Sequence, residues 1–134
     1  MTVFADTSAL YAALDRDDVN HAPALEAWQD LLDRQASLVT HSYVLLETSV
    51  LLQSRLGIAA LREFENNVVP LFRIDWIGAA RHHAGVEAAL TANRRKLSIV
   101  DCISFQTMRE SGLRIAYCFD AHFREQGFQL IPRQ

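Results

Sequence analysis

Short apolar runs along this chain alternate with longer stretches in which apolar residues recur every three or four positions. The short runs predict strands at 2–6, 37–41, 70–76 and 114–120, and a last short strand at 128–132. The longer stretches predict the helices that separate them. Because strands that alternate with helices are typical of βαβ units, we expect an α/β fold with a single three-layer α/β/α domain over residues 1–134. Its central sheet should be mainly parallel and flanked by helices.

Capping signals mark where several of these helices begin and end. Helices are predicted at 8–17, 22–35, 42–56, 58–68, 78–95 and 98–111. Thr7 or Ser8 can cap the first, and Ser42 the third, which should end at Gly57. Ser98 and Asp101 have the spacing of a capping box at the start of the last.

Composition narrows the class of protein. Half of the 134 residues are hydrophobic, so one domain can bury a sufficient core. The net charge of −3 argues against a polycationic nucleic-acid-binding surface, but it does not exclude a nuclease whose positive charge comes from a bound metal ion. Two cysteines make no disulfide framework. With no signal peptide and no apolar run that could span a bilayer, we expect a cytoplasmic protein with no membrane partner.

Four acidic residues occupy positions at which catalytic or ligand-binding side chains are commonly found in α/β folds. Asp6 and Asp120 each end an apolar strand, and Asp101 stands at a helix start. Glu47 lies in the helix that follows strand 37–41, inside the apolar stretch "VLLETSVLL". Because ligands of open α/β sheets bind beyond the carboxyl ends of the strands, all four could converge on one edge.

Each acid also has a simpler explanation. Asp6 could serve helix entry, Asp101 could complement a helix dipole, and Asp120 could be a turn residue. Glu47 is harder to explain, because a carboxylate on an apolar helix face needs a partner. A salt bridge to a buried arginine is the alternative. We expect instead that the apolar residues around Glu47, namely Tyr43, Val50 and Leu51, dock this helix on the sheet.

Four converging carboxylates would repel one another unless they bound a cation. Oxygen ligands suit Mg²⁺, and the chain has no cysteine and histidine spacing typical of zinc. Such a site suits phosphodiester hydrolysis, in which the metal orients the phosphate and activates water.

The four acidic segments also carry a resemblance. "VFADTSAL", "LLETSVLL", "LSIVDCISF" and "AYCFDAHF", in this order, resemble the PIN-domain ribonucleases, in particular the VapC-type toxins of toxin–antitoxin pairs. The resemblance covers nearly the whole chain. It implies an endoribonuclease that uses one or two Mg²⁺ or Mn²⁺ ions held by Asp6, Glu47, Asp101 and Asp120. It also implies that Ser8 holds a water or a carboxylate in the site.

The same resemblance implies partners: an RNA substrate, a cognate antitoxin protein, and a second copy of the chain in a homodimer formed through the helix at 42–56. It also implies products with a 5′-phosphate and a 3′-hydroxyl. The last motif departs from the family, because Cys118 stands where Thr or Ser is usual. Phe123 is interpreted as a packing residue and His122 as structural rather than catalytic.

The role of one basic segment and two other functions remain as alternatives. Arg94, Arg95 and Lys96 could contact RNA phosphates or simply decorate a helix C-terminus. A receiver-type phosphoacceptor domain has a similar length and an acidic Mg²⁺ pocket, but it needs a lysine after a late strand, and Lys96 precedes a helix instead. A catalytically silent PIN-like binding module is the second alternative, and in it the acidic residues would only cap helices and form turns.

Overall fold

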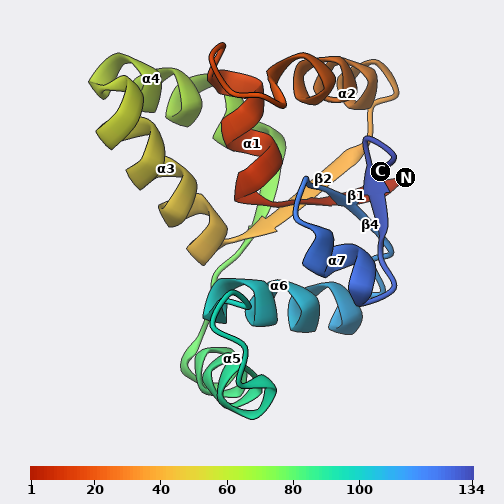
Figure 1. Cartoon of the computed structure of the whole chain (residues 1–134). Helices are drawn as coiled ribbons and strands as arrows, with labels where there is room; N and C mark the ends of the chain where they lie inside the picture. Colours follow the sequence, from red (N-terminus) through yellow and green to blue (C-terminus); the bar gives the residue numbers. More distant parts are fainter.

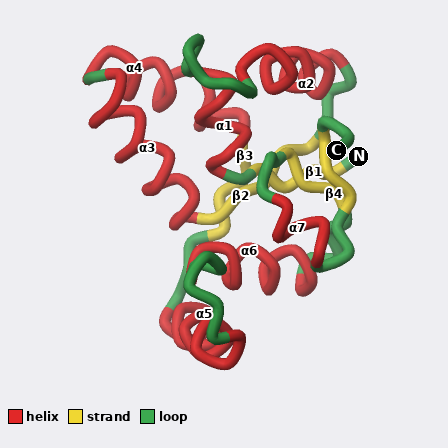
Figure 2. Tube along the Cα trace, in the orientation of Figure 1, coloured by secondary structure: helices red, strands yellow, loops and turns green.

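The computed structural model describes residues 1–134 and has a central sheet of five parallel strands. The strands are β1 (Thr2–Ala5), β2 (Ser37–His41), β3 (Phe72–Asp75), β4 (Ile115–Tyr117) and β5 (Gln129–Ile131). They lie in the order β3-β2-β1-β4-β5, and every neighbouring pair is parallel. Figure 2 shows the strands gathered in the middle of the molecule. The predicted α/β/α fold is confirmed.

Helices cover both faces of this sheet. One group comprises α1 (Thr7–Leu14), α2 (His21–Asp33), α3 (Ser42–Leu56) and α4 (Ile58–Glu63). The other comprises α5 (Ala79–Ala92), α6 (Ile99–Glu110) and the short α7 (Ala121–Glu125). The two groups lie on opposite sides of the strands (Figure 1). None of the helices combines the length and the apolar character that a membrane-spanning segment requires.

The core forms where β1 and β4 meet the helices. Val3, Phe4 and Ala5 are fully buried, and so are Tyr117 and Phe123. The Phe123 ring lies 4.9 Å from that of Phe105 and 6.3 Å from that of Phe4, measured between centroids. The interpretation of Phe123 as a packing residue is therefore confirmed. These contacts fix α7, and with it the residues that follow β4, against the sheet.

Several element boundaries differ from the prediction. The helix predicted at 58–68 is α4 followed by a π-helical turn at Phe64–Val68, and α7 was not predicted at all. The helix predicted to reach residue 95 ends at Ala92, because Asn93 adopts the left-handed conformation that commonly ends helices. The β4 strand stops at Tyr117, three residues before Asp120.

Two of the predicted helix caps are also different. The cap of α1 is Asp6, not Thr7 or Ser8, because the Asp6 side chain accepts the Ser8 N–H. The side chain of His41, not of Ser42, accepts those of Tyr43 and Val44 at the start of α3. The imidazole can do this because its Nδ1 is a hydrogen-bond acceptor when the ring is neutral. The capping box of Ser98 and Asp101 is confirmed.

Candidate active site

The strand order reverses between β1 and β4, and the candidate site lies at the carboxyl ends of these two strands. The chain proceeds from β1 to β2 and β3 on one side of the sheet, and to β4 and β5 on the other. Ligands of open α/β sheets bind at such a reversal. Asp6 follows β1 directly, and its backbone N–H donates to the Tyr117 carbonyl at 3.0 Å, so the ends of the two strands stay together.

Asp6 is held rigidly at this edge by Ser8. The Asp6 carboxylate accepts hydrogen bonds from the Ser8 hydroxyl at 2.7 Å and from its backbone N–H at 3.2 Å. The Ser8 oxygen in turn accepts the N–H of Phe119 at 2.9 Å. Ser8 therefore connects the segment after β1 to the segment after β4.

The electrostatic environment of Asp6 disfavours a bare negative charge. Burial raises the pKa of Asp6 to about 7; the hydrogen bonds from Ser8 oppose this rise, and the neighbouring charges of Asp101 and Asp120 add to it. Only 5% of the residue is exposed. Strongly perturbed carboxyl groups in a crevice are candidates for a functional site.

Asp101 lies in the first turn of α6, near Asp6 and Asp120. One of its carboxylate oxygens accepts the Ser98 N–H at 3.1 Å, and its own N–H donates to the Ser98 hydroxyl at 3.0 Å. Burial raises the pKa of Asp101 above its ordinary value, and the charge of Asp120 raises it further. The capping box thus holds the Asp101 carboxylate in a position where burial disfavours its charged form.

Asp120 and His122 complete the cluster. Asp120 caps α7, and its Oδ1 accepts the His122 N–H at 2.9 Å. The His122 Nδ1 lies 3.3 Å from Asp120 Oδ1 and 3.7 Å from Asp101 Oδ2. One potential ligand atom from each of these three residues lies within 4.8 Å of the others.

These residues fit a divalent cation. Asp6, Asp101 and Asp120 form no ion pair with any lysine or arginine, and His122 is the one basic side chain in contact with two of them. The His122 Nδ1 is buried without a hydrogen-bond partner, although it faces two carboxylates. Oxygen ligands with an added nitrogen are a suitable donor set for Mg²⁺ or Mn²⁺, and the cation would remove the repulsion among the acids.

Glu47 is not among the three residues whose ligand atoms lie within 4.8 Å of one another. The prediction that Tyr43, Val50 and Leu51 dock α3 is wrong for Val50, whereas Leu51 packs against the core and Tyr43 is partly buried. Glu47 is exposed, and Leu46 and Val50 beside it are 62% and 52% exposed. The helix instead buries Val44, Thr48 and Leu52, which recur every four residues. Because apolar residues occur on nearly every side of α3, the sequence did not indicate which face is buried. A role for Glu47 at the metal stays a prediction.

The basic segment 94–96 flanks the cluster without entering it. Arg94, Arg95 and Lys96 are exposed in the connection between α5 and α6, just before the Ser98 cap. The Arg94 guanidinium pairs with Glu125 of α7 at 3.1 Å. This pair connects the loop before Asp101 to the helix after Asp120. Contact of the segment with RNA stays a prediction.

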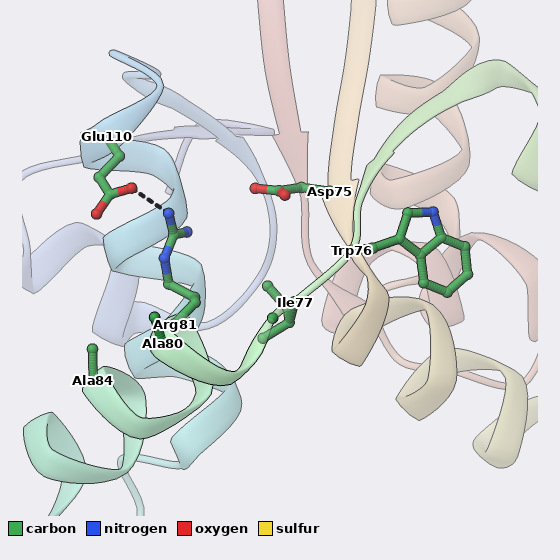
Figure 3. Close-up of a pocket in the computed structure, with 8 residues that line it drawn as sticks. Asp75, Trp76, Ile77, Ala80, Arg81, Ala84 and Glu110 are labelled. Carbon is green, nitrogen blue, oxygen red and sulfur yellow. Dashed lines mark hydrogen bonds and ion pairs between the residues drawn. The ribbon is translucent and has the colours of Figure 1, made fainter.

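A hollow of about 500 Å³ elsewhere on the surface does not involve the acidic cluster. It lies between the connection from β3 to α5 and the end of α6. Figure 3 shows Arg81 reaching toward Glu110 on one side, with Trp76 on the other. Arg81 also donates to the Thr107 hydroxyl at 2.7 Å, so its charge is already engaged within the protein.

The sequence interpretation did not predict that His122 would lie beside two carboxylates of the cluster. The signal for this in the sequence was the spacing Asp120-x-His122, which places the imidazole two residues after a carboxylate. Cys118, the departure from the family pattern, is fully buried, and its thiol donates to the Asp120 carbonyl at 3.5 Å. It therefore occupies the place of the usual hydroxyl residue and contacts the segment that carries Asp120.

Known proteins share this architecture. Residues 3–129 match the PIN domain family. The 23S rRNA-specific endonuclease VapC20 of Mycobacterium tuberculosis, found in strains CDC 1551 / Oshkosh and ATCC 25618 / H37Rv, is 31% identical over 127 residues, which cover 94% of this chain and 95% of the relative. The crystal structure of VapC20, described as a sarcin-ricin loop cleaving toxin, superposes with a TM-score of 0.82 at 30% identity, over 94% of this chain and 95% of that one.

A more distant structure has the same fold. FitAcB from Neisseria gonorrhoeae superposes with a TM-score of 0.67 at 16% identity, over 97% of this chain and 96% of that one. The family match and the VapC20 likeness each extend over nearly all of the chain. The chain therefore belongs to the PIN-domain family, among its VapC-type members.

Proposed function

We propose that this protein is a metal-dependent endoribonuclease, the toxin of a type II toxin–antitoxin pair. The observation that carries the proposal is the convergence of Asp6, Asp101 and Asp120 at the reversal of the strand order. No lysine or arginine offsets their charge there. Membership of a nuclease family with the VapC20 endonuclease as a relative supports the same activity.

The chain's own residues would organise the reaction. Asp6 and Asp101 are pre-oriented by Ser8 and Ser98, so they can hold a cation without losing much conformational freedom. Asp120 is fixed by its cap of α7. A divalent cation bound there, Mg²⁺ or Mn²⁺ as one ion or two, supplies the positive charge that orients the scissile phosphate and makes water a better nucleophile.

The basic segment 94–96 is suited to the RNA backbone on either side of the scissile bond. Arginine forks match phosphate geometry, and these residues stand in the loop that leads to Asp101. Ribosomal RNA is the first substrate to test, because the 31%-identical relative is a 23S rRNA-specific endonuclease. A cognate antitoxin and a homodimer, both consistent with a cytoplasmic VapC-type toxin, complete the proposal.

The receiver-type alternative does not fit. Receiver-type domains have the strand order 2-1-3-4-5, whereas this sheet has the order 3-2-1-4-5. The silent binding module has the same fold as the nuclease, so an activity assay separates the two.

The proposal is tested by incubating purified protein with ribosomal RNA and Mg²⁺ or Mn²⁺. We expect discrete cleavage that EDTA abolishes, with products that carry a 5′-phosphate and can be ligated without prior phosphorylation. Asp6→Asn and Asp101→Asn should each lower the rate by at least about a hundredfold, because each removes a charge that holds the cation.

Asp33→Asn is a matched control, since Asp33 is an exposed carboxylate at the end of α2. It should cleave like the wild type. Cleavage that survives EDTA, or that the Asp6→Asn/Asp101→Asn double variant retains, would rule out the proposed chemistry. A folded, cation-binding protein that cuts no RNA would instead support the silent module.

A further inference from the structure

We propose that His122 is a nitrogen ligand of the divalent cation, through its Nδ1 atom, and that it shifts the site from Mg²⁺ toward transition metals such as Mn²⁺. The inference rests on the proposed metal-dependent function. It concerns a residue that the sequence suggested to be structural.

The backbone holds the imidazole beside the carboxylates. His122 is the second residue of α7, and its N–H donates to Asp120 Oδ1 at 2.9 Å. This bond fixes the Asp120 carboxylate at the first turn of α7, on which His122 lies. The neighbouring Phe123 is fully buried among aromatic rings, so α7 cannot readily turn His122 away.

The His122 Nδ1 atom has no hydrogen-bond partner, although it lies within ion-pair distance of two carboxylates. It lies 3.3 Å from Asp120 Oδ1 and 3.7 Å from Asp101 Oδ2, yet it forms no hydrogen bond with either oxygen. Only one other buried side-chain polar atom in the chain, Gln106 Oε1, lacks a partner. Buried polar atoms are nearly always satisfied, so an orphan that faces two carboxylates indicates a missing common partner.

The other engaged histidines differ from His122 in this respect. His41 uses both ring nitrogens, Nδ1 at the cap of α3 and Nε2 at Ser104. His82 Nδ1 pairs with the Tyr43 hydroxyl at 2.7 Å, and His21 Nδ1 with the Ala12 carbonyl at 2.8 Å. His122 alone directs a free nitrogen at acidic side chains.

The spacing of these atoms suits one small cation. Ligands bound at about 2.1 Å from the same ion lie about 3–4 Å apart, and the measured separations of 3.3 and 3.7 Å fall in that range. Mg²⁺ binds almost only oxygen ligands, whereas Mn²⁺ and the other first-row transition metals also accept an imidazole nitrogen. His122 would therefore make the site selective for Mn²⁺ over Mg²⁺.

The test detects the nitrogen directly by pulsed electron paramagnetic resonance of bound Mn²⁺. The protein is used without a histidine tag and in a buffer free of nitrogen ligands. Electron spin-echo envelope modulation should show ¹⁴N coupling in the wild type. Protein labelled with ¹⁵N only at histidine should show that coupling replaced by ¹⁵N coupling, and this comparison requires no mutation.

Variants add a second readout, the affinity for each metal measured by calorimetry. His122→Gln should lose the nitrogen coupling and bind Mn²⁺ about tenfold more weakly, with a smaller change for Mg²⁺. His83→Gln, at an exposed histidine of α5, should retain both properties of the wild type.

Two results would overturn the inference, and they differ in meaning. Mn²⁺ that binds without histidine nitrogen coupling would exclude His122 as a ligand and leave the proposed nuclease intact. Failure of the wild type to bind Mn²⁺ at all, at millimolar concentration, would remove the metal site and the proposed function together. Persistence of the coupling in folded His122→Gln would also contradict the assignment.

Discussion

At the scale of single residues, Asp6 and His41 show how burial sets protonation. Both are almost completely buried, and both have hydrogen-bond partners that fix their geometry. Burial raises the pKa of Asp6 and lowers that of His41, because in each case it disfavours the charged form. The two residues therefore make opposite contributions to the pH dependence of stability.

Asp6→Asn should stabilise the metal-free protein at pH 8. The pKa of Asp6 is about 7 in the folded chain against 3.8 in the unfolded chain, so the native state loses stability as the pH rises from about 4 to about 7. Asparagine can accept the same bonds from Ser8 without the charge. We expect a gain of about 2–4 kcal/mol in the free energy of unfolding at pH 8 that shrinks toward pH 4. Urea unfolding in EDTA measures it, with Asp33→Asn as the unaffected control; a less stable Asp6→Asn variant at pH 8 would refute this reading.

His41→Asn should reduce the acid sensitivity of the fold. The pKa of His41 falls from 6.5 to about 4 in the folded chain, first because of burial and then because of the charge of Arg81. Its contribution to stability is fully present above pH 6.5 and is lost as the pH falls to about 4, because the unfolded state binds the proton more readily.

Asparagine caps helices well at any pH. Between pH 6.5 and pH 4, the free energy of unfolding of the wild type should therefore fall by about 3 kcal/mol more than that of His41→Asn. Denaturant titrations across this range compare the two proteins. Parallel stability curves would show that His41 remains protonatable in the fold.

At the scale of elements, the close contact of α5 and α6 positions the helix that carries Asp101. Gly85 is buried in the middle of α5, and a Cβ atom there would overlap Ile103 Cγ1 of α6. Ile103 is itself fully buried. The helices approach this closely because residue 85 has no side chain.

Gly85→Ala should therefore destabilise the protein although alanine is the better helix former. The overpacking cost of about 1–3 kcal/mol should exceed the gain of about 1 kcal/mol in helix propensity. In an Ile103→Ala background the space is free, and Gly85→Ala should become neutral or stabilising. A double-mutant cycle by thermal or urea unfolding measures this coupling, and additive effects would show that the contact is not tight.

At the scale of the whole molecule, the acidic cluster couples the two halves of the sheet. Asp6 comes from the start of the chain, whereas Asp101 and Asp120 come from its last third. A cation held between them binds only the native arrangement, so it should raise the apparent stability of the entire domain.

Mn²⁺ should raise the melting temperature, and the rise should grow with the logarithm of its concentration above Kd. At a hundredfold excess over Kd the gain is about 2.7 kcal/mol. The gain should vanish in Asp101→Asn and remain in Asp33→Asn, as measured by differential scanning calorimetry. A melting temperature that is unaffected by millimolar Mn²⁺ would count against any metal site.

Local sequence patterns were sufficient to predict most of the secondary structure and several of the candidate site residues. Apolar periodicity predicted the five strands and most helices, and the capping box of Ser98 and Asp101 was readable because its hydrogen bonds join residues three apart. The positions of Asp6 and Asp120 after strands predicted their convergence, because parallel strands end at one edge. The resemblance to the PIN-domain family, now confirmed, rested on these same segments.

Contacts between segments far apart in the sequence determined which face of α3 is buried and which side chains meet at the acidic cluster. α3 carries apolar residues on nearly every side, so only its packing against α1, through Thr48 and Thr7, determined that Glu47 faces solvent. The proximity of His122 to Asp101 depends on how α7 packs on α6, and no local pattern contains that distance. The sequence by itself determined which residues could carry chemistry, because side-chain type and strand ends are local properties. The tertiary structure decided which of them meet, because that depends on the relative placement of whole elements.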